Sequence, residues 1–520
     1  MYLSFIHHLK RLIKIIFMKK SIIYLSIAAA SITSCSKSFV DIAPDNFISA
    51  NNYFREEADF VQGTNATYAP LRNVYNIAYV NGEMRSDNTH YIFNNSNRGN
   101  LVREEIADFI DNPTAEPTYQ KWQFNYRVIA YANEVLSRID NFNFSSAAVK
   151  DGLKGELLFL RSFAYFDLLQ YFGDVPLVLT PTSGPAAEII GEKSTMLRTP
   201  KAEVYTQIIA DIKESINLLP VKSAQVKGRA TKGSAQMLLG NIYVVRKDWP
   251  AAHDAVKSII DGNQYRLVTE YANIYSTGNK NNEESIFEIQ YLQGNIGLQS
   301  TFAYTFMPNL TNLSPITGFT FNNQSIGGWN IPSEDLITSY ETGDKRKAAS
   351  IVNGYTGSNG SFVNQPFIKK YHQLPIPAPN GSAANGNDNF PVYRYAEALL
   401  YMAEILNEQG KSAEALPYLN EIRKRAGLGD ITNTNQVQLR SIILHERRVE
   451  LAFENKRWLD LVRTGNAVAV MNAYGAALKA SGNHPNLVPS TYNVNENKLL
   501  FPIPFNERLV NPKLEQNPGY

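Results

Sequence analysis

The spacing of apolar residues constrains the fold of this chain more than any other feature of its sequence. In residues 153–171 a stripe of Leu, Ala and Tyr recurs every three or four positions, and a second stripe of Phe and Leu lies beside it. A period near 3.6 residues is that of an α-helix, and two stripes predict a helix buried on most sides. Residues 205–219 carry a similar stripe, with Thr199-Pro200 as the predicted cap and first turn and Pro220 as the stop. The sequence therefore predicts a mainly α-helical protein.

Two predicted helical hairpins repeat one spacing of residues. Each has a small residue, an apolar or aromatic residue three positions later and an alanine twelve positions later. These residues are Gly240, Tyr243 and Ala252 in one hairpin and Ala403, Leu406 and Ala415 in the other. Small residues at the first and last of these positions let two antiparallel helices cross closely, and the spacing resembles that of the tetratricopeptide repeat. The alternative is a pair of unrelated helical hairpins.

Two segments between the helical blocks have a different composition. Residues 291–332 and 353–391 are rich in Asn, Gly, Ser and Pro, with scattered aromatic residues. This composition is typical of long loops and short strands, and long loops on a rigid frame often carry binding function. We therefore expect binding residues in the loop-rich segment 291–391, before the repeat-like helices of 392–465.

The sequence lacks the short motifs of common catalytic sites. A further helix is predicted through residues 439–453, and its His445-Glu446 pair starts the motif of a zinc protease, but Val449 stands where the second His is required. We find no G-x-S-x-G elbow, P-loop, G-x-G-x-x-G turn or paired-Cys metal site. A glycosidase uses two carboxylates across one sugar bond and has no short signature, so hydrolysis remains a rival hypothesis.

The charge of the chain does not indicate nucleic-acid binding. The formal net charge is +2, but residues 1–34 carry five basic and no acidic residues. Without them, 45 basic and 48 acidic residues remain. A nucleic-acid surface needs a dense stripe of Lys and Arg, and the sequence shows none.

The N-terminal segment has the pattern of a bacterial lipoprotein signal. Met18, which we expect to be the true start, opens a short basic region, an apolar run of about twelve residues follows, and small residues lead to the only cysteine, Cys35. The run is too short to span a bilayer, and basic residues interrupt the longer alternative, a transmembrane helix over 9–32. We predict that residues 1–34 are removed and that Cys35 carries acyl chains that anchor the protein to a membrane.

Many short motifs, taken in chain order, resemble the SusD/RagB family of outer-membrane nutrient-binding lipoproteins of Bacteroidetes. The most extended one is Arg457-Trp458-Leu459-Asp460-Leu461-Val462-Arg463-Thr464-Gly465. The others lie at residues 39–44, 125–134, 156–177, 228–233, 284–291, 343–346, 394–397, 423–428, 446–454, 500–504 and 516–520. Each motif alone is weak, but the ordered set covers essentially all of the chain after Cys35.

The resemblance implies a right-handed scaffold of tetratricopeptide-like helix pairs on which a less regular, loop-rich portion packs. It divides the chain into an N-terminal region, 35–275, and a C-terminal region, 276–520. It also implies a lipid-anchored, non-enzymatic protein of the outer membrane that faces outward, binds a glycan or other oligomeric nutrient, and hands it to a SusC-like TonB-dependent transporter. Family members exported to the surface often carry acidic residues soon after the lipidated cysteine, whereas here residues 36–40 come before Asp41.

Because these acidic residues are missing next to Cys35, outward display is a separate expectation from membrane anchoring. We expect no cofactor, no metal and no nucleic-acid partner.

Candidate ligand-binding residues are chosen from the chemistry of sugars. A sugar ring offers an apolar C–H face and a rim of hydroxyl groups, so proteins pair a flat aromatic ring with Asn, Asp, Gln or Arg at its edge. Residues of this kind in predicted loops are Trp329, Asn330, Tyr291, Asp87, Asn88 and Tyr91. Packing of a loop onto the scaffold is the alternative for each of them. Trp122, Trp249 and Trp458 lie in predicted helices, so we assign them to the core.

Two other functions remain open at this point. A member of the same family could bind peptides instead of glycans. A helical-repeat scaffold could also serve only as an interaction platform, without its own ligand. The loops rich in Asn, Gly and aromatic residues favour a ligand-binding protein, because a scaffold alone does not need them.

Overall fold

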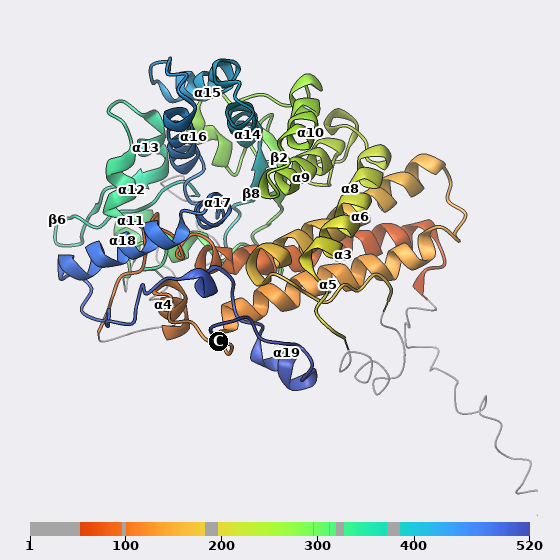
Figure 1. Ribbon diagram of the computed structural model, residues 1–520, viewed down its shortest axis with the longest axis horizontal. Coiled ribbons are helices and arrows are strands. Elements are labelled where there is room, and N and C mark those ends of the chain that lie inside the picture. The colour runs from red at the N-terminus through yellow and green to blue at the C-terminus, as the bar shows by residue number, and fades with distance from the viewer. Residues whose placement is uncertain are drawn as a thin grey trace, which may run out of the picture. The chain divides into compact units, whose positions relative to one another are not determined.

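Figure 1 shows the computed structural model of the chain. The structure describes residues 53–95, 100–181, 196–294, 296–310, 313–318, 327–371 and 385–520. Residues Glu57–Tyr520 form one compact unit. The predicted start at Met18, the signal segment 1–34 and the lipid-attachment residue Cys35 lie outside the described residues, so these remain predictions.

Helices dominate the described residues. The longer ones are α3 (Glu57–Asn81), α5 (Glu116–Ile139), α6 (Ala147–Phe172), α8 (Lys201–Leu218), α9 (Lys232–Val245), α10 (Trp249–Asp261), α14 (Tyr395–Glu408), α15 (Ser412–Ala426), α16 (Gln436–Glu450) and α18 (Ala467–Ser481). The shorter ones are α4 (Leu101–Ala107), α11 (Ser314–Thr317), α12 (Glu334–Ser339), α13 (Lys345–Ser350), α17 (Arg457–Thr464) and α19 (Phe505–Val510). The mainly α class predicted from the sequence is confirmed.

The strands are short and form two-stranded antiparallel ribbons. They are β1 (Thr89–His90) with β3 (Ile331–Pro332), β2 (Ser285–Ile289) with β8 (Phe390–Arg394), β4 (Ile351–Val352) with β7 (Phe367–Ile368), and β5 (Tyr355–Thr356) with β6 (Phe362–Val363). In each ribbon at least one strand belongs to, or borders on, the loop-rich segment 291–391. The ribbon of β1 and β3 positions the candidate site described below.

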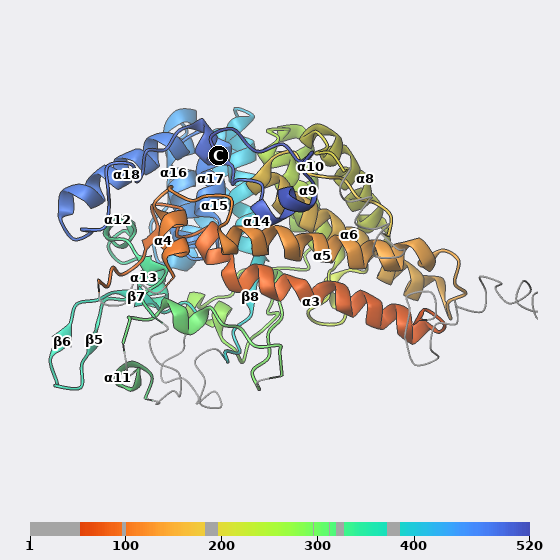
Figure 2. The same ribbon diagram turned by 90° about the horizontal axis from the view of Figure 1, so that it is seen from below.

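The helices contact one another in a series that follows the chain. Helix α3 packs on α5, α5 on α6, α6 on α8, α8 on α9, α9 on α10, α10 on α14, and α14 on both α15 and α16. Figures 1 and 2 show α3, α5 and α6 side by side at one end of this series and α14 to α16 at the other. This arrangement of packed helix pairs agrees with the predicted tetratricopeptide-like scaffold.

The two predicted hairpins form because their small residues lie at the helix crossings. A Cβ atom on Gly240 of α9 would lie 2.8 Å from a methyl group of Val256 on α10, which is too close for any side chain. In the second hairpin, Ala403 of α14 and Ala415 of α15 are fully buried. The small residues therefore set the close approach of the helices that the sequence predicted.

Helix α6 is buried around most of its circumference, as its two stripes predicted. Both Leu157 and Phe159, one from each stripe, have no exposed surface. The predicted start of α8 differs in detail: Pro200 occupies the N-cap position, while Thr199 forms a β-bridge with Val175 and accepts a hydrogen bond from a backbone N–H through its hydroxyl. Thr199 fixes the preceding loop instead of capping the helix.

The helix predicted over residues 439–453 ends at Glu450, and its charged residues contact other elements. Arg394 of β8 binds Glu450 at 2.9 Å and Glu454 at 2.8 Å, and Arg346 binds Glu446 at 2.5 Å. All of these side chains are buried. A buried charge without a partner is strongly destabilising, so this network ties α16 to the loop-rich segment and to α14.

Two of the three helical tryptophans lie in the core. Trp122 and Trp458 are buried, whereas Trp249 is only half-buried at the start of α10. Trp249 packs with one face against the core, because it is the first residue of its helix. Within the described residues, no helix is long and apolar enough to cross a membrane.

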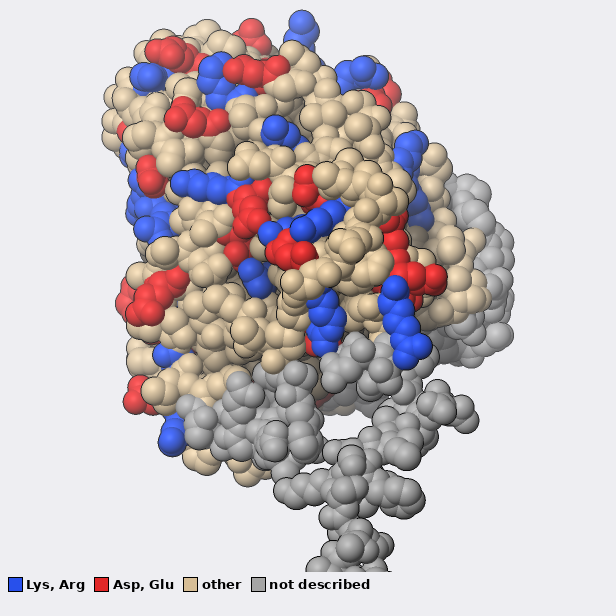
Figure 3. All heavy atoms as spheres, turned by 90° about the vertical axis from the view of Figure 1, so that its right-hand side faces the viewer, with Lys and Arg blue, Asp and Glu red and all other residues tan. Residues whose placement is uncertain are grey.

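The surface charges are mixed in sign. Figure 3 shows Lys and Arg interleaved with Asp and Glu on the face at the right-hand side of Figure 1. Lys154 of α6, for example, pairs with Asp140 at 3.2 Å and with Glu214 at 3.0 Å. A face of this kind lacks the dense basic stripe that nucleic-acid binding requires.

Candidate functional site

Five of the six candidate ligand-binding residues are brought together by the ribbon of β1 and β3. Thr89 pairs with Pro332 and His90 with Ile331, and the backbone N–H of Ile92 donates to the carbonyl of Gly328 at 2.8 Å. The ribbon therefore brings Asp87, Asn88 and Tyr91, which flank β1, close to Trp329 and Asn330, which directly precede β3. These two segments are about 240 residues apart in the sequence.

Glycines let the second strand approach its neighbours closely. A Cβ atom on Gly327 would lie 2.1 Å from the carbonyl oxygen of Pro308, and Gly328 has a φ of 93°. Both features exclude ordinary side chains. The two glycines thus fix the position of Trp329, the residue that follows them.

A groove with a volume of about 780 Å³ lies beside this ribbon. Its walls come from β1, β3 and α12, from residues 364–366, and from α18 with the turn that follows it. Figures 1 and 2 both show α18 next to α12. The aromatic and polar residues of the lining are Asp87, His90, Tyr91, Phe93, Ser333, Glu334, Asp335, Asn364, Gln365, Tyr474, Ser481, Asn483 and His484.

Tyr91 forms part of the groove wall and is held in place by several contacts. Its hydroxyl donates to Asp108 at 2.6 Å and accepts from Asn486, and its ring stacks on His90 with centroids 4.2 Å apart. Burial and the nearby Asp108 carboxylate raise the pKa of Tyr91, so its hydroxyl stays protonated at neutral pH. Tyr91 is 2% exposed and one face of its ring is covered by His90, so it forms a fixed part of the groove wall with its hydroxyl already engaged.

Asp87 and Asn88 hold the first strand against the helical scaffold. Arg457 makes two hydrogen bonds to Asp87, at 2.7 and 2.8 Å, and Arg448 binds Asn88 at 2.8 Å. Burial opposes ionisation of Asp87, but Arg457 and Arg448 outweigh it and lower the pKa of this carboxyl. Both side chains are buried, and Asp87 reaches the groove only as part of its wall.

Trp329 and Asn330 lie behind the groove. Trp329 is half-buried, with its ring 6.0 Å from that of Tyr91 and 5.3 Å from the guanidinium of Arg103. Asn330 is fully buried and accepts a hydrogen bond from the hydroxyl of Thr89 at 2.7 Å. Neither residue lines the groove, so both support Tyr91 and the ribbon from the side.

Tyr291 is placed elsewhere in the structure. It is 3% exposed, its hydroxyl donates to the carbonyl of Arg72 at 2.8 Å, and its ring meets that of Phe302 edge-on. It does not line the groove. The structure gives Tyr291 a packing role between α3 and the loop-rich segment.

Two groove residues, Tyr474 and His484, were not predicted from the sequence. Neither the hydroxyl oxygen of Tyr474 nor Nδ1 of His484 has a hydrogen-bond partner among the described residues, although both atoms are buried. Burial and the neighbouring His90 lower the pKa of His484 to about 4, so its ring is neutral at neutral pH. Tyr474 lies in the alanine-rich helix α18. A large aromatic residue among small ones is the feature by which the sequence could have identified it.

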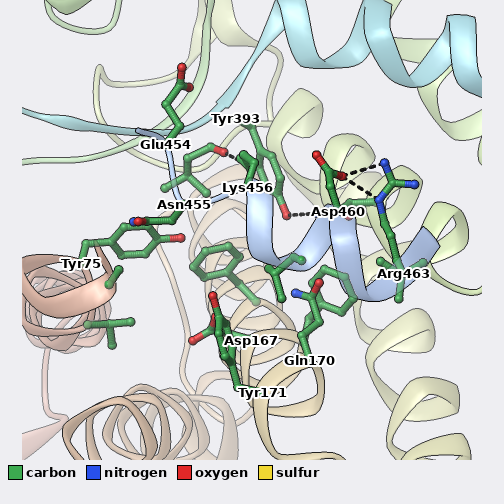
Figure 4. Close-up of a pocket in the computed structure, with 18 of the residues that line it drawn as sticks. Tyr75, Asp167, Gln170, Tyr171, Tyr393, Glu454, Asn455, Lys456, Asp460 and Arg463 are labelled. Carbon is green, nitrogen blue, oxygen red and sulfur yellow. Dashed lines mark hydrogen bonds and ion pairs between the residues drawn. The ribbon is translucent and has the colours of Figure 1, made fainter. Parts of the chain in front are cut away.

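A second, smaller cavity lies inside the molecule and is shown in Figure 4. Its volume is about 70 Å³, enough for a few water molecules. In Figure 4, Tyr75, Asp167 and Tyr171 face Lys456, Asp460 and Arg463 across the cavity. Asp167 pairs with Lys121 at 2.5 Å and Asp460 with Arg463 at 2.7 Å. These paired charges and the small volume indicate a structural interior rather than a ligand site.

The described residues contain no group of three or more His, Cys, Asp or Glu side chains arranged to hold a metal ion. The groove is therefore characterised by its aromatic rings, its apolar side chains and its carboxylate and amide groups. Such a surface can stack on the flat face of a ring and bond to hydroxyl groups at its edge.

Comparisons with known proteins agree with this architecture. A family model described as "SusD family" matches residues 341–520, and one described as "Starch-binding associating with outer membrane" matches residues 38–244. The "SusD-like protein P2" of Formosa agariphila is 27% identical, over 97% of this chain and 100% of that protein. The "Starch-binding protein SusD" of Bacteroides thetaiotaomicron is 24% identical, over 71% of this chain and 72% of that protein.

Comparison with solved structures finds the same family. A solved structure titled "Laminarin binding SusD-like protein" superposes with a TM-score of 0.72 and 25% identity, and covers 90% of this chain and 100% of that one. The fold, the sequence and the two family models together define the class of this protein: nutrient-binding proteins with a tetratricopeptide-like helical scaffold. The chain belongs to the SusD/RagB family.

Proposed function

We propose that this protein is a lipid-anchored outer-membrane protein that binds a glycan in the groove beside β1 and β3 and delivers it to a SusC-like TonB-dependent transporter. The observation that carries the proposal is the groove itself, about 780 Å³ in volume and lined by Tyr91, Phe93 and Tyr474 among polar side chains. The volume is in the range of sites that hold small ligands. The names of the relatives, which include starch-binding and laminarin-binding proteins, support a glycan as the ligand.

The geometry suits weak, reversible binding. Each ring that stacks on a sugar contributes roughly 0.5–1.5 kcal/mol, by analogy with aromatic pairs. A few such contacts with some hydrogen bonds give affinities in the micromolar to millimolar range, from which a ligand is released quickly. Rapid release is what a protein that passes its ligand to a transporter needs.

We propose that the protein binds its glycan without cleaving it. A glycosidase needs one carboxylic acid that is protonated at the working pH, facing a second carboxylate. Asp87 is held in its ionised form by Arg457 and Arg448, which lower its pKa. Asp335 is bound to Arg448 at 2.5 Å. Both carboxylates serve ion pairs that hold the ribbon and α12 to the scaffold.

The proposed anchor and partner have separate support. Cys35 follows an apolar signal-like segment, and one of the two matching family models is described as associating with the outer membrane. A protein held at the outer membrane by acyl chains can present a groove to an importer in the same membrane. The transporter and outward display form the part of the proposal that rests on the family.

The test is a binding screen on purified protein. Immobilised glycans of defined structure and a peptide library are screened first, and hits are measured by isothermal titration calorimetry. We expect at least one glycan to bind, with no shorter products after prolonged incubation, as checked by chromatography. Release of shorter products would identify an enzyme, and binding of peptides alone would identify the peptide-binding alternative. Co-purification with a SusC-like transporter from membranes tests the delivery step.

A further inference from the structure

The charges around the groove bear on which class of glycan it accepts, an inference that rests on the proposed function. Its described lining contains three carboxylates, Asp87, Glu334 and Asp335, and neither Lys nor Arg. Glu334 and Asp335 are exposed, and the Asp335 side chain has 59% of its surface accessible. A ligand in this groove therefore meets negative charge at the rim.

The guanidinium groups of Arg448 and Arg457 pair with carboxylates of the groove lining. Arg448 binds both Asp87, at 3.0 Å, and Asp335, at 2.5 Å. Arg457 makes two parallel hydrogen bonds to Asp87. Both guanidinium groups are thus already bonded to carboxylates of the protein itself, so neither is free to receive a uronate or a sulfate from a ligand. Both also lie behind the lining and do not form part of it.

The remaining polar groups suit uncharged hydroxyls. The hydroxyl of Tyr474 and Nδ1 of His484 lack partners among the described residues. The amides of Asn364, Gln365 and Asn483 also line the groove and can both donate and accept hydrogen bonds. The rest of this surface is apolar and contacts C–H groups as well as it contacts hydrocarbon.

We propose that the groove selects uncharged saccharides and discriminates against uronic-acid and sulfated ones. Glu334 and Asp335 produce the discrimination, because both are exposed at the rim, although Asp335 also pairs with Arg448. A carboxylate or sulfate on the ligand would be repelled by them and would find no free cation among the described residues that line the groove. Repulsion at an exposed site is screened by salt, so the discrimination is expected to weaken as ionic strength rises.

The experiment compares a neutral hexose oligosaccharide that binds in the screen with the same oligosaccharide oxidised at its primary hydroxyls to carboxylates. We expect the oxidised form to bind at least fivefold more weakly in 50 mM salt. In the double variant Glu334→Gln and Asp335→Asn this ratio should fall at least threefold. Because the oxidised ligand keeps its backbone and linkage, the change in ratio reports charge rather than fit.

The matched control is the double variant Glu414→Gln and Asp430→Asn. It removes the same charge from exposed residues that do not line the groove, and it should keep the wild-type ratio. Equal or tighter binding of the oxidised ligand by the wild type would overturn the inference and leave glycan binding intact. A ratio that is the same in both double variants would also overturn it. Failure of every glycan to bind would instead overturn the proposed function.

Discussion

Arg457 and Asp87, 370 residues apart in the sequence, form a two-fold hydrogen-bonded ion pair with distances of 2.7 and 2.8 Å. This contact fastens the first strand of the β1–β3 ribbon to helix α17. It also explains why a residue that the sequence presents as a loop acid is buried in the structure. The geometry of the groove therefore depends on a largely buried ion pair at its wall.

The first prediction concerns this ion pair. Asp87→Ala leaves the guanidinium of Arg457 without its partner at a largely buried position and should lower the free energy of unfolding by about 3–5 kcal/mol. Chemical denaturation monitored by circular dichroism measures the change. Asp335→Asn is the control, because that side chain is mostly exposed and its loss should cost less than about 1 kcal/mol. Equal effects of the two substitutions would contradict a structural role for Asp87.

The second prediction concerns Trp329. Trp329→Ala removes the ring that supports Tyr91 and Arg103, and should weaken glycan binding about threefold to tenfold while costing about 2 kcal/mol of stability. Calorimetric titration and thermal unfolding measure the two effects. Trp249→Ala is the matched control, since Trp249 is also half-buried but lies on α10. Trp249→Ala should lower stability by a similar amount and leave the affinity unchanged. A normal affinity in Trp329→Ala would remove Trp329 from the site.

The third prediction separates a ligand contact from a packing contact. Tyr474→Phe removes a buried hydroxyl that has no partner among the described residues, so stability should stay within about 1 kcal/mol of the wild type or rise. If the hydroxyl bonds to the glycan, the affinity should fall about fivefold. Tyr492→Phe is the control, because its hydroxyl is also buried but does not line the groove. Unchanged affinity in Tyr474→Phe would show that this hydroxyl makes no ligand contact.

The fourth prediction follows from the buried ion network. Burial alone would raise the pKa of Glu454, but Arg394 and Lys370 outweigh it and lower this pKa to about 2. A carboxyl whose pKa is lower in the folded state stabilises the fold above its unfolded value, near 4.5, and loses that contribution as the pH falls towards 2. Stability should therefore drop by about 3 kcal/mol between pH 5 and pH 2 on account of this group.

Denaturation across this pH range checks the dependence. Glu454→Gln should be less stable at pH 7, because Arg394 and Lys370 lose a partner, and its stability should vary less between pH 5 and pH 2. Glu414→Gln, at an exposed position, should behave as the wild type does. An unchanged pH dependence in Glu454→Gln would show that other carboxyl groups cause the loss of stability in acid.

The fifth prediction concerns the anchor. Cys35→Ala removes the only cysteine of the chain, and with it the proposed site of acylation. The variant should move from the membrane fraction to the soluble fraction, because acyl chains are the proposed attachment. Fractionation and immunoblotting measure this, with Ser36→Ala as the neighbouring control. Unchanged membrane association of Cys35→Ala would contradict the lipid anchor.

The sequence by itself determined the helical scaffold. The stripes of α6 and the small residues Gly240 and Ala403 were sufficient, because helix period and close helix crossing depend on residues near one another in the chain. It also identified both strands of the ribbon as candidate binding segments, through their aromatic and amide residues. These are local properties, and local properties can be recognised in one sequence.

Only the tertiary structure decided which of these residues can meet a ligand. Asp87 and Asn88 became buried partners of Arg457 and Arg448, Trp329 came to support Tyr91, and α18 brought Tyr474 into the groove wall. A polar or aromatic residue in a loop has the same sequence pattern whether it faces solvent or an ion pair hundreds of residues away. Its role is set by long-range packing and by the cost of burying a charge without a partner, and neither can be inferred from neighbouring residues.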